Sequence, residues 1–453
     1  MNNTPINNFL KEYSANSPAR FHMPGHKGLA ELKNNTLSND ITEIPGADNL
    51  LCPNGIIKQS QELCAKYYGS SYAFYITQGS TTGILTMINA LPRNIKILVE
   101  RTCHKSVISA LALSGHNHDF LYPKYNDTSN TFDPISIDDI DQALKNDHSI
   151  GALFLTRPNY LGQCFDIKSV SQLCEKYEII LMVDEAHGAH FNFFDNLPES
   201  SIKYADMVIQ SAHKTLPTLT QGAILHVNFK SAKMPSIEHI SHYLTIFHTT
   251  SPSYLILASI ESGWQNAKNA DWNKHYERIN SFINSLGAYN DIILQDNLNA
   301  KDFSRLVLDF YKIGITGIQA AEFLAKNNII VEYSDQLRVI CITSPNDLDL
   351  WYNMLGNAIK KIPIKNPIKP ISYYNIPLQN EMLISQAVLH ESAILTNLND
   401  SIGKICACTV GAYPPGSALI VPGEVISKKV IDYIEKLDAN GSDLFGLPIQ
   451  TVK

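Results

Sequence analysis

Two charged side chains stand where short apolar runs of the sequence end. Asp184 directly follows the run 179–183, and Lys214 comes four residues after the run 207–210. An amine buried beside the end of a sheet has a lowered pKa, and the neutral amine is a nucleophile. A nearby carboxylate can keep a proton on a nitrogen atom of a bound group. The alternative for Lys214 is a solvated loop lysine, which is the commonest fate of this residue type.

Other polar residues follow neighbouring apolar runs in the same way. Gly79, Ser80 and Thr81 come after the run 72–76 and open an apolar helical pattern. The start of a helix offers free backbone N–H groups to an anion, so this segment suits a phosphate group, although a capped turn without a ligand fits as well. His104 follows the run 95–99. A structural role is the alternative for this histidine.

Asp184 also opens a segment that contains Glu185, His187 and His190. A metal site is one interpretation, but residues at a strand end rarely converge on a metal without a third ligand close by, so we expect none. A phosphate-binding turn, an acid, a histidine and a lysine at one sheet edge fit pyridoxal phosphate instead. The lysine would form the Schiff base, and the acid would keep the pyridine nitrogen protonated.

The composition excludes several classes of protein. The 453 residues include 36 Lys and Arg against 43 Asp and Glu, which gives a net charge of −7 and argues against a nucleic-acid-binding protein. No apolar run approaches the roughly 18 residues of a membrane helix. The N-terminus lacks the apolar core of a secretory signal. Eight scattered cysteines form no disulfide framework, so we expect a reduced cytoplasmic protein.

The elements that must position these residues alternate along the chain. Apolar runs at 72–76, 95–99, 151–155, 179–183, 207–210 and 222–227 read as strands, and helical patterns lie between several of them. The clearest helix covers 166–177, with Asp166 as its N-cap. Near-continuous apolar strands separated by helices predict an α/β fold with a mainly parallel sheet that is covered on both faces.

The rest of the chain divides into further parts. A strand, helix and two strands are expected at 305–311, 318–325, 329–333 and 338–343, and a proline-rich linker follows. Beyond it we expect a helix near 378–391, a strand over 405–410 and a last helix. The predicted division is an N-terminal arm (1–60) that lies on a neighbouring subunit, a large domain (61–290), a small α+β domain (291–362) and a C-terminal module (363–453).

Eight stretches, in this order, resemble the pyridoxal-phosphate-dependent ornithine/lysine/arginine decarboxylase family. They span nearly the whole chain, and the start near residue 21 resembles the short form without an N-terminal receiver-like domain. The resemblance implies the aspartate-aminotransferase-like fold, which is fold type I. The stretches cover residues 21–28, 40–46, 79–81, 104–106, 184–190, 211–215, 249–254, and 413–416 with 421–424.

The resemblance also implies a role for each site residue. Lys214 carries the cofactor, Asp184 pairs with its pyridine nitrogen, His104 stacks on its ring, and His187 lies beside its ring hydroxyl; Lys214, Asp184 and His104 are the implied catalytic residues. Thr250 reaches the phosphate bound by a partner subunit. The residues implied to hold the phosphate within one subunit are Gly79, Ser80, Thr81, Ser211 and His213.

The implied activity is decarboxylation of arginine, lysine or ornithine, which yields carbon dioxide and a polyamine or its precursor. A cytoplasmic homodimer or higher oligomer is implied, with no nucleic acid or membrane as partner. Glu43 and Asp48 are candidates to bind the cationic side chain of the substrate. Cys408 stands where the family often has an acid. This departure keeps two alternatives open: an aminotransferase or lyase acting on another amino acid, and a non-catalytic protein that binds the cofactor.

Overall fold

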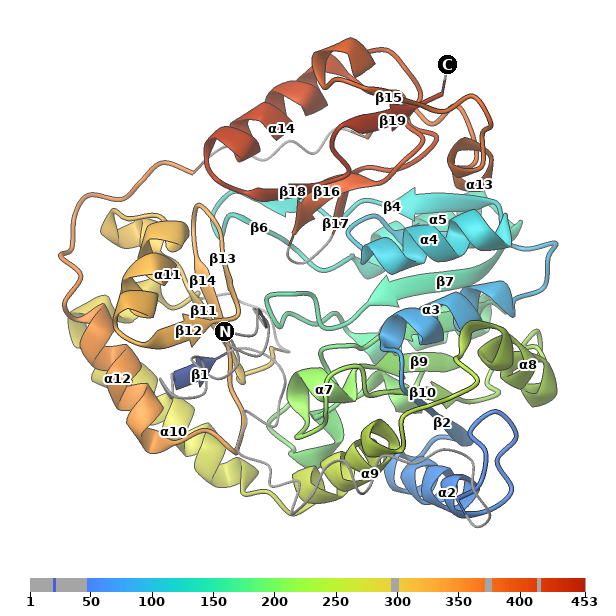
Figure 1. Cartoon of the computed structure of the whole chain (residues 1–453), viewed down its shortest axis with the longest axis horizontal. Helices are drawn as coiled ribbons and strands as arrows, with labels where there is room; N and C mark the ends of the chain where they lie inside the picture. Colours follow the sequence, from blue (N-terminus) through green and yellow to red (C-terminus); the bar gives the residue numbers. More distant parts are fainter. Residues whose placement is uncertain (1–18, 22–46, 295–300, 371–376, 414–416, 453) are drawn as a thin grey trace, which may run out of the picture.

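Figure 1 shows a computed structural model of the chain, in which residues 19–21, 47–294, 301–370, 377–413 and 417–452 are described. Parts of three stretches that carry the family resemblance, 22–28, 40–46 and 414–416, lie outside the described residues. Glu43 lies outside them as well. Within the described residues, none of the helices combines the length and the apolar character needed to cross a membrane.

The largest sheet has seven strands in the order β2-β10-β9-β8-β7-β3-β4. The strands from β9 to β4 are parallel, and β10 is antiparallel to both of its neighbours. The predicted mainly parallel sheet is therefore confirmed. The strands are β2 (Tyr72–Ile76), β3 (Lys96–Glu100), β4 (His118–Leu121), β7 (Ile150–Thr156), β8 (Ile180–Asp184), β9 (Met207–Gln210) and β10 (Ala223–Val227).

Six of these strands were predicted from their apolar runs, and β4 was not. This strand contains His118 and Asp119, and only its first and last residues are buried. It lies at the edge of the sheet, where it pairs with β3 alone. An edge strand can expose one face to solvent, so its sequence lacks the continuous apolar run of the central strands.

Helices cover both faces of this sheet, as Figure 1 shows. Asp166 caps α6 as predicted, because its side chain accepts hydrogen bonds from the backbone N–H groups of Lys168 and Ser169. One face packs on α3 (Ser80–Asn89), α4 (Lys105–Ser114) and α8 (Ile237–Phe247). The other face packs on α2 (Ile56–Tyr68), α5 (Ile137–Asn146), α6 (Ile167–Lys176) and α9 (Tyr254–Lys268).

A second core lies around the antiparallel sheet β11-β14-β13. Its strands are β11 (Arg305–Leu308), β13 (Tyr333–Ser334) and β14 (Val339–Ile342), and the helices packed here are α10 (Trp272–Ser285), α11 (Gly317–Lys326) and α12 (Asp349–Ile359). The strand predicted over 305–311 ends at Leu308, and a 3-10 turn, η5 (Phe310–Ile313), follows.

The short strand β1 (Ala19–Phe21) belongs to the predicted N-terminal arm. It pairs in parallel with β12 (Ile329–Val331) of the same chain. Ala19 and Phe21 are fully buried in the core around β11, β13 and β14. For these three residues the expectation that the arm lies on a neighbouring subunit is wrong, because their apolar side chains complete a core of their own chain.

The C-terminal segment forms a compact unit above β4 and α4 in Figure 1. It contains the sheet β17-β16-β18, the pair β15-β19, and the helices α13 (Ile384–Val388) and α14 (Lys428–Ala439). The strand predicted over 405–410 is wrong: Ile405 and Cys406 form isolated bridges, and the ladder begins at Val410. The helix expected near 378–391 covers only five residues. The strand bounds are β15 (Ile394–Thr396), β16 (Val410–Tyr413), β17 (Ser417–Ile420), β18 (Asp443–Phe445) and β19 (Ile449–Thr451).

A buried ion pair ties this C-terminal unit to the large sheet. Arg101 follows β3, and its Nη2 lies 3.1 Å from Oε2 and 3.3 Å from Oε1 of Glu424. The Nη1 group of Arg101 donates to the carbonyl of Ala418 at 2.6 Å. Burial raises the pKa of Glu424, and the charge of Arg101 opposes that shift. The pair therefore holds two segments that lie more than 300 residues apart.

We expect Arg101→Met to destabilise the protein by about 3–5 kcal/mol, because Glu424 would be left as an unpaired buried charge. Denaturant unfolding of the purified variant measures this loss. The double variant Arg101→Met/Glu424→Gln should regain part of it, since the lone charge is then removed. Equal stability of the wild type and Arg101→Met would contradict the expectation.

Candidate active site

A cavity of about 1110 Å³ opens beyond the carboxyl ends of the parallel strands. The large sheet supplies one wall, the segment around β13 supplies a second, and β17 with α14 supplies a third. The hairpin of β5 (Tyr125–Asn126) and β6 (Thr131–Phe132) also lines it. In a parallel α/β sheet this edge is where ligands bind, so the cavity is the candidate active site.

Lys214 enters the cavity from the short helix α7 (Ala212–Thr215), which directly follows β9. Its Nζ atom lies 3.0 Å from Nε2 of His187. Burial lowers the pKa of Lys214, and the nearby carboxylate of Asp184 only partly opposes that shift. The site therefore favours the neutral amine, which is the nucleophilic form.

Asp184 is the last residue of β8 and is buried in the same cavity. Its Oδ1 atom accepts a hydrogen bond from the N–H group of Ala186 at 3.0 Å. Burial raises the pKa of this carboxyl, whereas the charge of Lys214 lowers it. A buried carboxylate is costly unless a cation faces it, so the site is suited to a ligand with a protonated ring nitrogen.

His187 lies between Lys214 and Arg305. Its Nε2 faces the Lys214 amine, and its Nδ1 lies 3.1 Å from Nη2 of Arg305. Burial, together with the positive charges of Lys214 and Arg305, lowers the pKa of His187 well below its usual value. The imidazole is therefore neutral.

His104 caps α4 at the opposite side of the cavity. Its Nδ1 accepts from the N–H group of Ser106 at 3.2 Å and lies 2.7 Å from the hydroxyl of the same residue. Burial and then the charge of Lys214 lower the pKa of His104 to about 4. A neutral imidazole held by its own helix can pack flat against a ring without a charge penalty.

Several groups that could hold a phosphate line the same cavity. Gly79 has a positive φ of 80°, and a Cβ atom at this position would meet nothing within 4 Å, so space remains in front of the first turn of α3. Ser80 and Thr81 start this helix. The buried hydroxyl of Ser211 has no hydrogen-bond partner within the part of the chain that the structure describes. Free helix N–H groups and an unpaired hydroxyl fit an anion.

The structure brings nine of the ten predicted site residues to this cavity and leaves Thr250 outside its lining. Thr250 is exposed between α8 and α9, and the N–H group of the neighbouring Thr249 donates to Gln78 at 2.8 Å. The loop therefore lies beside the segment that leads to Gly79. The nine residues are Gly79, Ser80, Thr81, His104, Asp184, His187, Ser211, His213 and Lys214.

Glu185 and His190, which suggested a metal site in the sequence, bind other partners. The Glu185 carboxylate accepts hydrogen bonds from Ser200, Ser201 and Gln210. His190 lies 3.2 Å from Asp302. Both side chains therefore hold the scaffold behind the strand ends, away from the lining of the cavity.

Three residues near the site escaped the sequence reasoning. The Tyr160 hydroxyl donates to Glu332 at 2.9 Å, and its ring packs edge-on against His187 with the centroids 5.2 Å apart. Arg305 reaches His187 from β11, 118 residues further along the chain. For Arg305, the signal in the sequence was a charged residue at the start of a buried strand. This signal does not indicate which side chain Arg305 contacts.

The arrangement fits pyridoxal phosphate. A neutral lysine amine can attack an aldehyde, a buried carboxylate can face the pyridine nitrogen, and the start of α3 with Ser211 can receive the phosphate. His104 and His187 add two neutral rings at the same place. The groups that could hold this cofactor thus line one cavity, apart from Thr250.

Comparison with known proteins agrees with this geometry. The sequence profile described as "Orn/Lys/Arg decarboxylase, major domain" matches residues 4–289, and the profile of the C-terminal domain matches residues 378–451. The arginine decarboxylase of Bacillus subtilis is 31% identical over 99% of this chain and 95% of its own length.

Two solved structures share the fold. The constitutive lysine decarboxylase of Escherichia coli matches with a TM-score of 0.76 at 18% identity, covering 93% of this chain and 75% of that one. Lysine decarboxylase A of Pseudomonas aeruginosa also matches at 0.76, with 16% identity over 91% of this chain and 73% of its own. The predicted fold class is therefore confirmed.

Proposed function

The chain belongs to the Orn/Lys/Arg decarboxylase family, and we propose that arginine is the amino acid that it decarboxylates. Pyridoxal phosphate is its cofactor, and the reaction removes the carboxylate of a basic amino acid. The observation that carries this function is the buried Lys214 amine, which lies 3.0 Å from His187 and in the same cavity as the buried Asp184. Arginine is favoured because the relative that is 31% identical over nearly the whole chain is an arginine decarboxylase.

The charge of the cavity supports a cationic substrate. Seven carboxylates and three Lys or Arg side chains line it within the described residues, so negative charge prevails. A substrate with a guanidinium or ammonium group gains from such a lining. The carboxylates are those of Glu100, Asp133, Asp184, Glu332, Asp335, Glu424 and Asp443.

Asp48, one of the two acids considered from the sequence, has another task. Its carboxylate accepts hydrogen bonds from the backbone N–H groups of Asn54 and Gly55 at 2.9 and 2.8 Å, which closes the turn before α2. Although burial raises its pKa, these backbone bonds prevail and lower it to about 2. Asp48 does not line the cavity of its own chain. The lining acids other than Asp184 and Glu424 are therefore the better candidates for the substrate cation.

We propose the following roles for the residues of this chain. Lys214 attaches the cofactor, Asp184 keeps its ring nitrogen protonated, and His104 packs against its ring. The bound cofactor supplies the electron sink that accepts the electrons left when the carboxylate departs. The remaining task of the protein is to place the bond that breaks perpendicular to the ring and to return a proton to Cα, with Lys214 or a nearby histidine as the donor. Gly79, Ser80, Thr81, Ser211 and His213 hold the phosphate.

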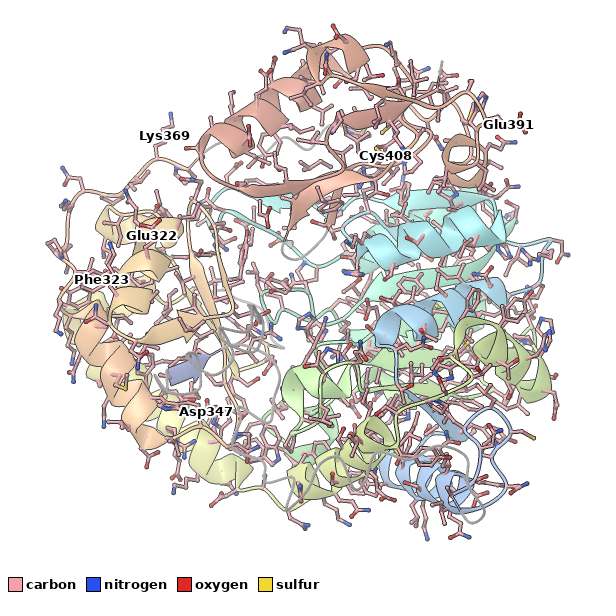
Figure 2. The ribbon with its side chains drawn as sticks, in the orientation of Figure 1. Glu322, Phe323, Asp347, Lys369, Glu391 and Cys408 are labelled. Carbon is pink, nitrogen blue, oxygen red and sulfur yellow. The ribbon has the colours of Figure 1, made fainter. Side chains whose placement is uncertain are left out.

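Cys408 does not weaken this proposal. Figure 2 shows Cys408 within the C-terminal unit, and the residue does not line the cavity. Its sulfur accepts a hydrogen bond from the N–H group of Gln450 at 3.3 Å. A hydrogen bond with Cys406 lowers the pKa of the Cys408 thiol to about 7. The acid that the family often has here would therefore contribute to the packing of this unit and not to substrate binding in this cavity.

Incubation of the holoenzyme with arginine, lysine and ornithine tests the function. We expect carbon dioxide from arginine with the highest kcat/KM of the three, together with the amine that is left. This amine is a polyamine precursor. Assay of keto acids in the same mixtures detects transamination instead. If none of the three amino acids releases carbon dioxide while the cofactor is bound, the proposed function is wrong.

We further propose that the active form is at least a homodimer. Thr250 is exposed beside the phosphate segment, which suits a contact with a second subunit. Light scattering at micromolar concentration should give at least twice the mass of one chain. A fully active monomer would contradict this proposal.

We also propose that the protein is cytoplasmic. This location is supported by the eight cysteines of the chain, all of which carry free thiols. We also propose that the chain divides into an arm (1–60), a large domain (61–290), a small domain (291–362) and a C-terminal module (363–453).

A further inference from the structure

Arg305 reaches the active site through a hydrogen bond to His187. It is the first residue of β11, its side chain is 2% exposed, and its Nη2 lies 3.1 Å from Nδ1 of His187. The guanidinium carbon also lies 5.9 Å from the centre of the Tyr160 ring. Arg305 itself does not line the cavity. Arg305 is therefore not placed to contact a substrate or a cofactor in the cavity, and its hydrogen bond toward the site is the one to His187.

The chemistry of this contact determines which nitrogen of His187 carries the proton. A guanidinium group has donors only, so Nδ1 of His187 must be the acceptor. A neutral imidazole has one donor and one acceptor, so the proton is on Nε2. Nε2–H then points at the Lys214 nitrogen 3.0 Å away. Lys214 can accept this hydrogen bond only as a neutral amine with a free lone pair.

A charged Lys214 ammonium group beside this imidazole is excluded by the same count of donors and acceptors. An ammonium group at Lys214 would donate to Nε2 while Arg305 donates to Nδ1, and an imidazole that accepts at both nitrogens would have to be an anion. Contact with Arg305 thus links the tautomer of the His187 imidazole to the protonation state of Lys214. A guanidinium group keeps its charge throughout the physiological pH range, so the link is permanent.

Arg305 makes few hydrogen bonds for a buried guanidinium. Its Nε and Nη1 groups have no hydrogen-bond partner within the described residues. The residue lies close enough to the buried Asp302 for the two charges to interact. A buried guanidinium with so few hydrogen bonds is expensive, which favours a task in the site over a purely structural one.

We propose that Arg305 is a positioning residue that fixes the Nε2–H form of His187 and thereby holds Lys214 as a neutral amine ready to bind the cofactor. This inference rests on the proposed function because it assumes that Lys214 is the attachment point. In that step the lysine nitrogen forms a double bond to the aldehyde carbon. The aldehyde oxygen leaves as water, with both hydrogen atoms taken from the amine. Only the neutral amine has the lone pair that this attack needs.

Nuclear magnetic resonance of the full chain, labelled with ¹⁵N in its histidines and freed of cofactor, tests the proposal directly. In the wild type, His187 should show a protonated Nε2 and an unprotonated Nδ1, with the signals assigned by their loss in His187→Gln. Arg305→Met removes the donor at similar volume and should abolish this preference. Arg305→Lys retains a donor and should restore it. Arg157→Met is the matched control, since Arg157 is equally buried but pairs with Glu185 and the carbonyl of Phe165.

The rate at which cofactor-free protein captures pyridoxal phosphate gives a second readout. We expect Arg305→Met to slow the appearance of visible absorbance about tenfold, the effect of losing one hydrogen bond that favours the reactive form, with recovery in Arg305→Lys. An unchanged His187 tautomer in Arg305→Met would overturn the proposal. Equal changes in Arg157→Met would also overturn it, because they would indicate a general structural effect. The tautomer of His187 is measured without substrate, so the outcome of this test does not depend on whether the protein releases carbon dioxide.

Discussion

Replacement of Lys214 by alanine is expected to abolish both the covalent attachment of pyridoxal phosphate and the release of carbon dioxide. Lys214 is the lysine whose amine lies 3.0 Å from His187 and shares a cavity with Asp184. In the proposed function Lys214 is the nucleophile and a proton donor, and the loss of both tasks should lower kcat by more than about 10⁴-fold. Borohydride reduction of the holoenzyme, followed by peptide mapping, should place the cofactor on Lys214 in the wild type and on no lysine in the variant.

The stability of the Lys214→Ala variant separates chemistry from folding. Burial lowers the pKa of Lys214, so the folded protein gains nothing from its charge at neutral pH. We therefore expect the cofactor-free variant to unfold at a temperature no lower than the cofactor-free wild type. Lys203→Ala is a suitable control, because Lys203 is exposed and pairs only with Glu199 among the described residues. A cofactor label on Lys105 or Lys27 of the wild type would refute the assignment.

Replacement of Asp184 by alanine should leave a folded protein that has lost more than about 10³-fold in kcat. In the proposed function the carboxylate keeps the ring nitrogen of the cofactor protonated, and without this proton the ring would no longer accept the electrons of the broken bond. A lost charged hydrogen bond alone is worth about 1.5–3 kcal/mol, or some ten- to 150-fold, so a larger loss would identify the electronic effect. Steady-state kinetics with arginine and a thermal unfolding curve measure the two consequences.

The raised pKa of Asp184 determines whether removal of its charge stabilises or destabilises the folded protein. Burial raises this pKa above its value in the unfolded chain, so the ionised carboxylate costs the folded, cofactor-free protein stability at pH values above the unfolded pKa. Removing the charge in Asp184→Asn should therefore leave the stability at pH 7 unchanged or higher. The holoenzyme should behave in the opposite way, because the carboxylate then faces a protonated ring. Near-normal turnover in Asp184→Ala would refute the electronic role.

The sequence by itself predicted the central sheet and most of the site. Strands buried on both faces must be almost wholly apolar, so their ends are easy to find. Asp184 is the last residue of β8, and Lys214 follows the end of β9 by four residues. Parallel strands place their carboxyl ends at one edge, which is why residues spread from 79 to 214 line one cavity. Apolar strands and the polar residues at their ends can be recognised from local sequence, without knowledge of contacts between distant residues.

The sequence was less informative where only one face is buried or where the chain bends. The edge strand β4 contains polar residues and was missed, and the mostly apolar run 405–410 was taken for a strand although it forms isolated bridges before the ladder begins at Val410. Short strands in the C-terminal unit are defined by which partner they meet. A local pattern does not contain that information.

Only the tertiary structure decided which residues complete the site from outside the large sheet. Arg305 meets His187 across 118 residues, and Glu332 meets Tyr160 across 172. Arg101 holds Glu424 across 323 residues and so joins the C-terminal unit to the cavity wall. Each of these contacts depends on how separate cores pack together, and that packing is determined by the shapes of whole surfaces. Periodicity and spacing along one segment record what the segment buries, but not which distant side chain lies opposite it.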